Sequence, residues 1–362
     1  MKLGIISLGG KSSKSIIEEA KNHFDVAEHL DLKQFEVRVD SKEMSVMYKG
    51  KPLENFDCLY VRGSFRYALL QRSITRALCS EVYMPLSPQA FTLGHNKFLT
   101  LLELQKNKVP LPKTYFAATT DIAKELLNQV HYPIIMKIPS GTQGKGVMFA
   151  DSINAAKSIL DALETFNQPY LLQEYVETGA TDLRVIVVGK KVVAAMKRKA
   201  LPDELRANIH AGGKGLPYEP DYDTEQIAIK SAAAIGADVC AIDILDAGGK
   251  PQVIEVNLSP GLAGITKATR KNIAGTIAKF LYEKTKEFHE TKETKRKGDA
   301  LRELELDQKK EKEILTSLDI KAGIIRLPKI IANICDFCQD EEVSITVKKD
   351  QIIIKKHEIK KD

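Results

Sequence analysis

The segment CAIDILDAGGKPQVIEVNLSPGL, residues 240–262, decides the fold. Two β-rich runs, 240–245 and 252–256, flank an Ala-Gly-Gly turn. Glycine-containing turns between two such runs are typical of β-hairpins. The segment therefore predicts two paired strands with a short connection.

Three oxygen-bearing side chains lie in this hairpin. Glu255 and Asn257 are two positions apart and share one face of their strand, and the turn brings Asp243 alongside them. Carboxylate and amide oxygens are ligands that Mg²⁺ prefers, and the ion completes its shell with phosphates and waters. Two metal ions bridged by one carboxylate would neutralise a triphosphate. The three residues predict a metal site, with a solvated polar hairpin face as the alternative.

A glycine-rich loop, SGTQGKG at 140–146, follows the apolar run 134–138. Its three glycines let backbone N–H groups approach a phosphate closely. The spacing matches neither the P-loop pattern G-x-x-x-x-G-K-S/T nor the dinucleotide pattern G-x-G-x-x-G, so those nucleotide-binding folds lose support. The alternative is a simple glycine-rich turn.

Two lysines occupy unusual places, since Lys137 interrupts an apolar strand and Lys97 opens an apolar helix. Lysine is rarely buried without an anionic partner, and a nucleotide phosphate would supply one. The alternative is a lysine whose stem packs while its ammonium group reaches water. Downstream, Gln-Glu-Tyr-Val at 173–176 ends a β-like run and could receive adenine and ribose.

Charged residues gather further along the chain. Asp182 and Arg184 alternate on one strand, followed by Lys-Arg-Lys at 197–199 and Arg-Ala-Asn at 206–208. Arginine can hold a phosphate or carboxylate through two parallel hydrogen bonds. A surface run of charges is the alternative.

The length of 362 residues fits two or three domains, and the 43% hydrophobic content is typical of a protein that buries a core. No apolar run approaches the ~20 residues needed to span a membrane, and the short apolar N-terminus does not read as a signal peptide, so we expect a cytoplasmic protein. The five cysteines suit reduced thiols. Much of the positive charge lies beyond Lys284, which is weak evidence for nucleic-acid binding.

Strand-like and helix-like segments alternate in residues 1–95. The runs 3–8, 37–40 and 58–61 predict strands and 15–22 predicts a helix, which together favour a small parallel α/β sheet.

Helices alternate with paired β runs from residue 97 onward. The runs 184–188 and 192–196 predict a second hairpin. Residues 285–313 are dense in Lys and Glu and predict a solvated helix or a linker, and a β-rich segment follows at 314–356.

These features occur in one order, and that order resembles the ATP-grasp superfamily, within it most of all the RimK-type α-L-glutamate ligases. The similarity covers roughly residues 1–285. The strings that carry it are Gly141-Thr142-Gln143-Gly144, Gln173-Glu174-Tyr175-Val176, Arg206-Ala207-Asn208, Asp243-Ile244-Leu245 and Glu255-Val256-Asn257-Leu258-Ser259-Pro260-Gly261-Leu262.

The resemblance implies an α/β (α+β) protein with a defined domain order. A pre-ATP-grasp α/β domain would span 1–95, an ATP-grasp domain that binds ATP, metal and substrate 96–287, and a charged linker or helix 288–314. Residues 315–362 are similar to the AbrB family of swapped-hairpin proteins, which dimerise and often bind DNA.

The resemblance also implies roles for individual residues. Asp243, Glu255 and Asn257 would bind two Mg²⁺ or Mn²⁺ ions, and Arg198 and Lys137 would act in catalysis, Arg198 on the acyl-phosphate or tetrahedral intermediate. ATP would be bound by Lys97, Lys137, Gly141, Gln143, Gly144, Gly146, Glu174, Tyr175, Val176, Asp182, Arg206 and Asn208.

The implied activity is that of an ADP-forming acid–amino-acid ligase. It would add L-glutamate, or another amino acid, to a carboxylate of a protein C-terminus or a small molecule through an acyl-phosphate. The sequence departs from the family at Ser140, where an acidic residue is frequent, and in its C-terminal extension. A negatively charged acceptor would suit the arginines at positions 62, 66, 72 and 76.

Several questions stay open at this point. The acceptor could be a ribosomal protein, a carrier protein or a coenzyme, and we expect a homo-oligomer, dimer or tetramer, without a membrane partner. The alternative function is an ATP-binding, DNA-associated regulator that uses the AbrB-like tail. The intact set of three metal ligands argues against that alternative.

Overall fold

The computed structural model describes residues 1–42, 44–139, 146–166, 168–200, 214–306, 319–321, 324–326, 343–349 and 351–356. The chain divides into two compact units, Met1–Phe288 and His289–Asp362, which are described separately. None of the helices in the described ranges is both long and apolar enough to span a membrane.

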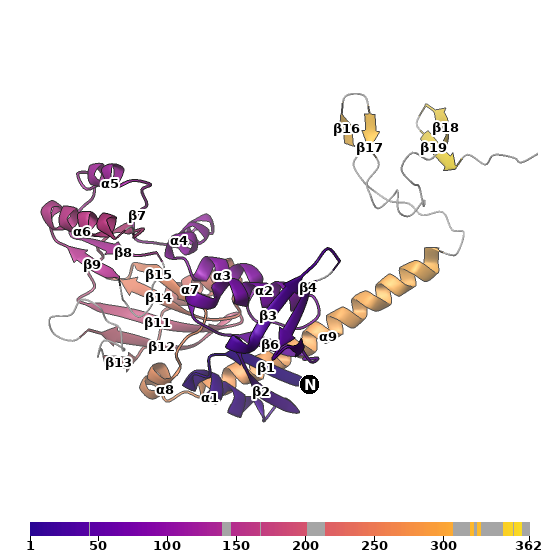
Figure 1. Ribbon diagram of the computed structural model, residues 1–362, viewed down its shortest axis with the longest axis horizontal. Helices are drawn as coiled ribbons and strands as arrows, with labels where there is room; N and C mark the ends of the chain where they lie inside the picture. The colour runs from indigo at the N-terminus through magenta and orange to yellow at the C-terminus, as the bar shows by residue number, and fades with distance from the viewer. Residues whose placement is uncertain are drawn as a thin grey trace, which may run out of the picture. The chain divides into compact units, whose positions relative to one another are not determined.

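A three-stranded parallel sheet with the strand order β2-β1-β6 opens the first unit (Figure 1). The predicted strands at 3–8 and 58–61 are its central strand and one edge. Its strands are β1 (Lys2–Ser7), β2 (Val26–Asp31) and β6 (Cys58–Val61). Helix α1 (Lys11–Ala20) packs on it through Ile16, Ile17 and Ala20.

The predicted strand at 37–40 forms, but not in that sheet. It corresponds to β3 (Phe35–Val39), which pairs antiparallel with β4 (Met44–Tyr48), and β4 pairs with β5 (Lys51–Pro52). The expected parallel sheet is therefore completed by β2, which the sequence analysis did not predict. Strands that follow each other through short turns pair antiparallel, because a parallel pair would need a long crossover connection.

Helices α2 (Ala68–Leu78) and α3 (Pro88–Gly94) lead into α4 (Lys97–Lys106). The side chain of Asn96 caps α4 by accepting hydrogen bonds from the N–H groups of Phe98 and Leu99. An Asn side chain at this position satisfies N–H groups that have no partner inside the helix. The cap fixes Lys97 as the first helical residue.

A four-stranded sheet with the order β7-β10-β8-β9 follows, with α5 and α6 covering one face (Figure 1). This sheet and its helices have a hydrophobic core of their own, which includes Leu160 and Leu163 of α6 and is separate from the main core. The elements are β7 (Thr114–Tyr115), α5 (Thr120–Leu126), β8 (Ile134–Lys137), β9 (Val147–Ala150), α6 (Ile153–Thr165) and β10 (Leu171–Glu174).

The largest sheet has five antiparallel strands in the order β13-β12-β11-β14-β15. Both predicted hairpins lie in it, and the turn between β11 and β12 has Gly189 at φ +62. Its strands are β11 (Thr181–Val188), β12 (Lys191–Lys199), β13 (Lys214–Pro217), β14 (Val239–Asp246) and β15 (Pro251–Asn257).

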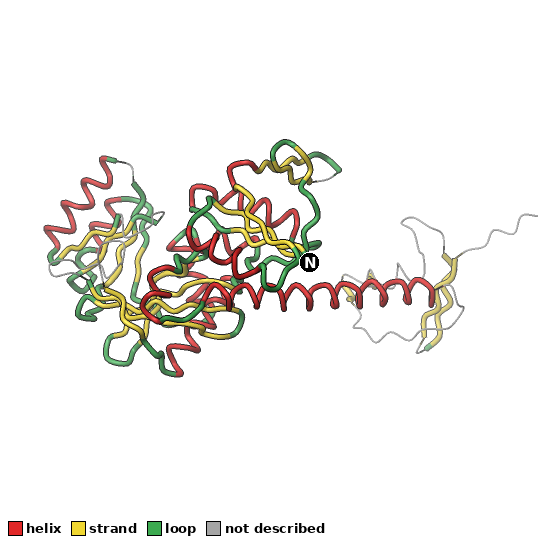
Figure 2. Tube along the Cα trace, turned by 90° about the horizontal axis from the view of Figure 1, so that it is seen from below, coloured by secondary structure: helices red, strands yellow, loops and turns green. Residues whose placement is uncertain are grey.

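Helix α7 (Tyr222–Ile235) follows β13 and precedes β14 in the chain, and it packs on this sheet (Figure 1). Asp221 caps its start, and Gly236 ends it in the left-handed conformation at φ +75, where a side chain is rarely tolerated. The short helix α8 (Ala263–Thr269) and the long helix α9 (Ile273–Leu306) follow. Figure 2 shows α9 as one uninterrupted helix, which covers much of the predicted linker.

The second unit contains two described hairpins. One joins β16 (Asp319–Lys321) and β17 (Ile324–Arg326), and the other joins β18 (Val343–Lys348) and β19 (Gln351–Lys356). Both hairpins lie in the β-rich segment predicted at 314–356. The rest of the AbrB-like match lies outside the described residues.

Candidate active site: charged side chains across the large sheet

Three charged side chains form a row across the large sheet. Arg184 on β11 lies opposite Asp243 on β14, and Asp243 lies opposite Glu255 on β15. Residues directly opposite each other in antiparallel strands project from the same face. The prediction that the hairpin brings Asp243 alongside Glu255 is confirmed.

An extra residue in β15 makes this row possible. Asp243 pairs with Glu255, but the next residue, Ile244, pairs with Val253, so Ile254 has no register partner. Val253 and Val256 are both buried, whereas Ile254 and Glu255 between them are partly exposed. A β-bulge of this kind shifts the alternation of faces by one position. Without it, Glu255 would share the buried face of Val253.

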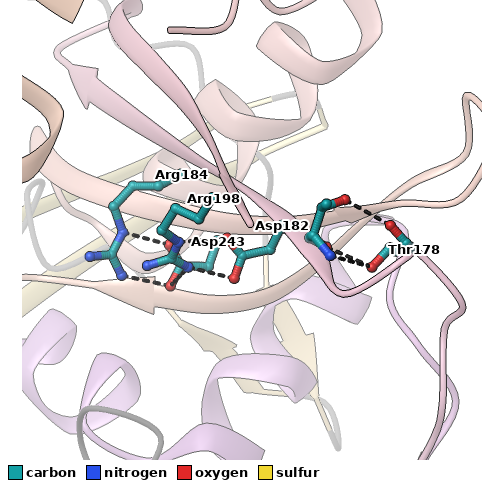
Figure 3. Close-up of polar contacts among 6 residues, drawn as sticks. Thr178, Asp182, Arg184, Arg198 and Asp243 are labelled. Carbon is teal, nitrogen blue, oxygen red and sulfur yellow. Dashed lines mark hydrogen bonds and ion pairs between the residues drawn. The ribbon is translucent and has the colours of Figure 1, made fainter. Parts of the chain in front are cut away.

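Two arginines hold two carboxylates on this sheet (Figure 3). Nε and Nη2 of Arg184 donate to Oδ1 and Oδ2 of Asp243 at 2.8 and 2.7 Å. Nε and Nη2 of Arg198 donate in the same way to Asp182, at 2.5 and 2.7 Å. Nη2 of Arg198 also lies 3.1 Å from Oδ2 of Asp243, which joins the two pairs into one network.

The network is almost fully removed from water. The side chains of Arg198 and Asp243 are 3% and 6% exposed. Burial alone would raise the pKa of Asp243, but the charges of Arg184 and Arg198 outweigh burial and lower this pKa to about 2. The carboxylate of Asp243 is therefore ionised at neutral pH.

The start of β11 is fixed by a turn that Figure 3 also shows. The hydroxyl of Thr178 donates to the carbonyl of Thr181 at 2.6 Å, and the hydroxyl of Thr181 donates to the carbonyl of Thr178 at 2.8 Å. Two reciprocal bonds of this kind hold the chain just before Asp182.

Glu255 has a different electrostatic environment. Burial, together with the negative charge of Asp243, raises the pKa of Glu255, and the positive charges of Lys97, Arg184 and Lys137 oppose this rise. These interactions place both lysines predicted to bind phosphate within electrostatic range of Glu255, one of the predicted metal ligands.

Lys137 lies at the end of β8, and its ammonium group donates to Oε1 of Gln173 at 2.6 Å. The amide of Gln173 in turn donates to the hydroxyl of Thr114 at 2.8 Å. Burial lowers the pKa of Lys137 to about 8, and the nearby charge of Lys97 acts in the same direction. The backbone N–H of Lys97 donates to the carbonyl of Pro139 at 3.2 Å, which ties α4 to the end of β8.

The segment predicted to hold adenine ends β10. Oε1 of Glu174 accepts a hydrogen bond of 2.9 Å from the hydroxyl of Tyr115 and lies 3.5 Å from Nζ of Lys113. The carboxylate thus fastens β10 to the strand β7. The ring of Tyr175 stands edge-on to Phe149, with 5.6 Å between centroids, and Val176 follows it.

The loop after β15 is fastened to the N-terminal part of the unit. Oδ1 of Asn257 accepts from the N–H of Ser259 at 3.1 Å, and Oγ of Ser259 accepts from the N–H of Gly63 at 3.0 Å. The N–H of Leu262 donates to Oγ of Ser12 at 2.9 Å. Sequence reasoning missed the contacts to Gly63 and Ser12, because nothing in a chain read alone pairs residues 196 or 250 positions apart.

Some predicted site residues lie outside the described residues. The end of the glycine loop is described: Gly146 has φ +75, and its carbonyl accepts from the N–H of Ile138 at 3.0 Å. The other positions, outside the described residues, are Gly141, Gln143, Gly144, Arg206 and Asn208.

The donor set around Asp243 fits magnesium bound together with a nucleotide. Among the described residues, no group of three His, Cys, Asp or Glu side chains could hold a metal ion by itself. Two carboxylates and one amide, from Asp243, Glu255 and Asn257, are present instead. Mg²⁺ in nucleotide sites is typically held by one or two carboxylates, with phosphates and waters completing the shell.

Comparison with known proteins decides the family. Residues 94–281, more than half of the chain, match the family model of the RimK-like ATP-grasp domain. A protein of Thioalkalivibrio sulfidiphilus named "Probable alpha-L-glutamate ligase" is 36% identical over 303 residues, covering 82% of this chain and 100% of the relative. This chain belongs to the RimK-like ATP-grasp ligase family.

A second relative agrees with this family, and a solved structure agrees with its fold. A protein of Stutzerimonas stutzeri with the same name is 34% identical and covers 82% of this chain and 100% of the relative. The solved structure of the ATP-grasp ligase PsnB with minimal precursor, Mg and ADP superimposes with a TM-score of 0.61 at 17% identity, covering 79% of this chain and 98% of PsnB. This structural likeness shows the ATP-grasp fold.

Proposed function

We propose that this member of the RimK-like ATP-grasp family is an ATP- and magnesium-dependent carboxylate–amine ligase. It adds L-glutamate, or another amino acid, to a carboxylate of a protein C-terminus or of a small molecule, and releases ADP and phosphate. The observation that carries the proposal is the alignment of Asp243 with Glu255 beside Lys97 and Lys137, inside the family segment.

The proposed metal ligands are Asp243, Glu255 and Asn257, with two Mg²⁺ or Mn²⁺ ions. A bound metal would supply positive charge to the phosphates of ATP. Lys97 and Lys137 add further positive charge, since both interact with Glu255. The relative PsnB was solved with Mg and ADP, which agrees with this assignment.

The nucleotide would lie along β8 and β10. We assign adenine to the segment Glu174–Tyr175–Val176 and the phosphates to Lys97, Lys137 and Gly146. Asp182 keeps its predicted place at the ribose. The two bonds from Arg198 occupy one lone-pair position on each oxygen of Asp182, so a second position on each oxygen is left for a ribose hydroxyl. The predicted ATP contacts of Gly141, Gln143, Gly144, Arg206 and Asn208 remain part of the proposal.

The reaction proceeds in two steps that need no protein nucleophile. An acceptor carboxylate oxygen attacks the γ-phosphorus of ATP, the bond to ADP breaks, and an acyl-phosphate forms. The amine of the amino acid attacks the acyl carbon, phosphate leaves, and the amine loses a proton to water. Positive groups spread the charge that develops in both steps, and Lys137 and Arg198 are the proposed catalytic residues.

The remaining predictions stay proposals. They include the domain boundaries after residues 95, 287 and 314, a homo-oligomer, and an AbrB-like module at 315–362. The comparisons give no support to a DNA-associated regulator, and we do not propose that alternative.

The test is phosphate release from ATP with Mg²⁺, a panel of amino acids and candidate acceptors, comparing wild type with Glu255→Ala. Release that depends on both amino acid and acceptor, and that the substitution abolishes, supports the ligase. Mass spectrometry of the acceptor then identifies the amino acid and the number added. Absence of release with every combination contradicts the proposal.

A further inference from the structure

The carboxylate of Asp243 has almost no capacity left for another partner. A carboxylate offers four lone-pair positions, two on each oxygen. Oδ2 accepts from Nη2 of Arg184 and faces Nη2 of Arg198, and Oδ1 accepts from Nε of Arg184. Three of the four positions are in use, so a cation that engages both oxygens must displace a guanidinium group.

Arg184 is the arginine that such a cation displaces. Arg198 has a second carboxylate, since it is paired with Asp182 through two bonds and is 3% exposed. Among the described residues Arg184 bonds to Asp243 alone, and its side chain is 14% exposed, against 3% for Arg198. Arg184 therefore has more room to move than Arg198, and its release would leave a free lone-pair position on each oxygen of Asp243.

We propose that Arg184 is a positioning residue which stands in for the metal: it neutralises and orients Asp243 in the metal-free protein, and a divalent cation and Arg184 compete for this carboxylate. This inference rests on the proposed metal site. Asp243 would remain ionised and correctly turned before the metal arrives, because a buried carboxylate without a partner is strongly destabilising. Once displaced, the guanidinium is free to bind an anionic group of the substrate.

The competition makes an unusual prediction for a positively charged residue in a nucleotide site. Removal of a competing cation tightens metal binding, whereas removal of a merely structural residue weakens it or leaves it unchanged. In the full-length protein saturated with ADP, we expect Arg184→Gln to bind Mn²⁺ at least about fivefold more tightly than wild type. Electron paramagnetic resonance of free Mn²⁺ measures this affinity, and saturating ADP separates it from any change in nucleotide binding.

Two further variants sharpen the experiment. Arg184→Lys keeps the charge but loses the two parallel bonds, so its Mn²⁺ affinity should lie between those of wild type and Arg184→Gln. It also tests the proposal if the Gln variant does not fold. Arg62→Gln is the control, because Arg62 is a buried arginine that, among the described residues, bonds to a hydroxyl and a backbone carbonyl rather than to a carboxylate. It should lower the unfolding temperature in EDTA without tightening Mn²⁺ binding.

The possible outcomes distinguish the competition between Arg184 and the metal from the metal site itself. Unchanged or weaker Mn²⁺ binding by both Arg184 variants, with normal binding by wild type, overturns the competition and leaves the ligase proposal standing. No Mn²⁺ binding by ADP-saturated wild type overturns the metal site and the competition together.

Discussion

Nη2 of Arg62 donates a 2.8 Å hydrogen bond to the backbone carbonyl of Pro260, 198 residues further along the chain. Nη1 of the same guanidinium donates to the hydroxyl of Tyr60 at 2.9 Å, and Arg62 is 4% exposed. The contact joins the parallel N-terminal sheet to the loop that follows the predicted metal ligands Glu255 and Asn257. The sequence suggests Arg62 as a contact for a negatively charged acceptor, but both terminal nitrogens of its side chain already bond within the protein.

Substitution of Arg62 should therefore change stability. We expect Arg62→Gln to lower the free energy of unfolding by about 2 kcal/mol, because buried hydrogen bonds to a charged group are lost. Chemical denaturation followed by circular dichroism measures the effect. Arg66→Gln is the control, since Arg66 is exposed and its loss should cost less than about 0.5 kcal/mol. Equal effects of the two substitutions would contradict this assignment.

The ionised side chain of Glu255 should destabilise the folded protein when no metal is bound. Burial and the charge of Asp243 raise the pKa of Glu255, so the ionised form is disfavoured in the folded protein. We expect Glu255→Gln to raise the stability of the metal-free protein by on the order of 1 kcal/mol and to abolish phosphate release.

The pH dependence gives the sign of this effect. A raised pKa means that the folded protein takes up the proton before the unfolded chain does as the pH falls. The stability advantage of Glu255→Gln should be full above the raised pKa and should disappear as the pH falls through it. Thermal unfolding in EDTA across the pH range measures the difference, and a variant less stable than wild type at every pH refutes it.

Nucleotide binding should weaken in mild alkali. Burial lowers the pKa of Lys137 to about 8, so its ammonium group loses its charge as the pH rises through this value. ADP affinity, measured by calorimetry, should then fall with pH. Lys137→Met should bind ADP roughly tenfold more weakly at pH 7, the loss of one charge-assisted contact, and should lack the decline near pH 8. A parallel decline in both proteins would assign the pH effect to another group.

The partly buried side chain of His95 should lower the free energy of unfolding in acid. Burial lowers its pKa to about 4, and within the described part of the chain its Nε2 has no hydrogen-bond partner. The unfolded chain binds the proton more readily than the folded protein, so stability is full above the unfolded pKa and falls as the pH drops toward 4. The loss from pH 7 to pH 4 should be up to about 3 kcal/mol. His95→Gln should flatten this slope in urea titrations, and an unchanged slope would exclude His95 as its source.

The sequence predicted those parts of the fold that depend on local pattern. The hairpins around Gly189 and around 247–249 formed as expected, because a glycine turn between two β-rich runs is a local signal. Strand β2 was missed: half of its residues, Val26–Asp31, are polar, and the strand is defined by pairing with β1. Pairing between distant segments leaves no local pattern to read.

The candidate site also has parts that follow from local pattern and parts that depend on pairing between distant segments. The positions of Asp243, Glu255, Lys97 and Lys137 follow from strand alternation and from unusual charges in apolar runs. The partner of Asp243 could not be predicted, because Arg184 reaches it only through the register of β11 against β14. The sequence also gave no sign of the bulge at Ile254, which depends on hydrogen bonding between two strands.

The bulge at Ile254 has a consequence for which changes in the gene the protein can tolerate. Loss of three nucleotides in the turn at 247–250 would shorten an exposed connection and leave both flanking strands in phase. Loss of the codon for Ile254 would instead remove the bulge and shift the alternation of faces by one position. Either the apolar side chains before Ile254 or the side chains of Glu255 and Asn257 would then lie on the opposite face of the sheet. Natural length variation within this hairpin should therefore collect in the turn, while the distance in sequence from Val253 to Asn257 stays fixed.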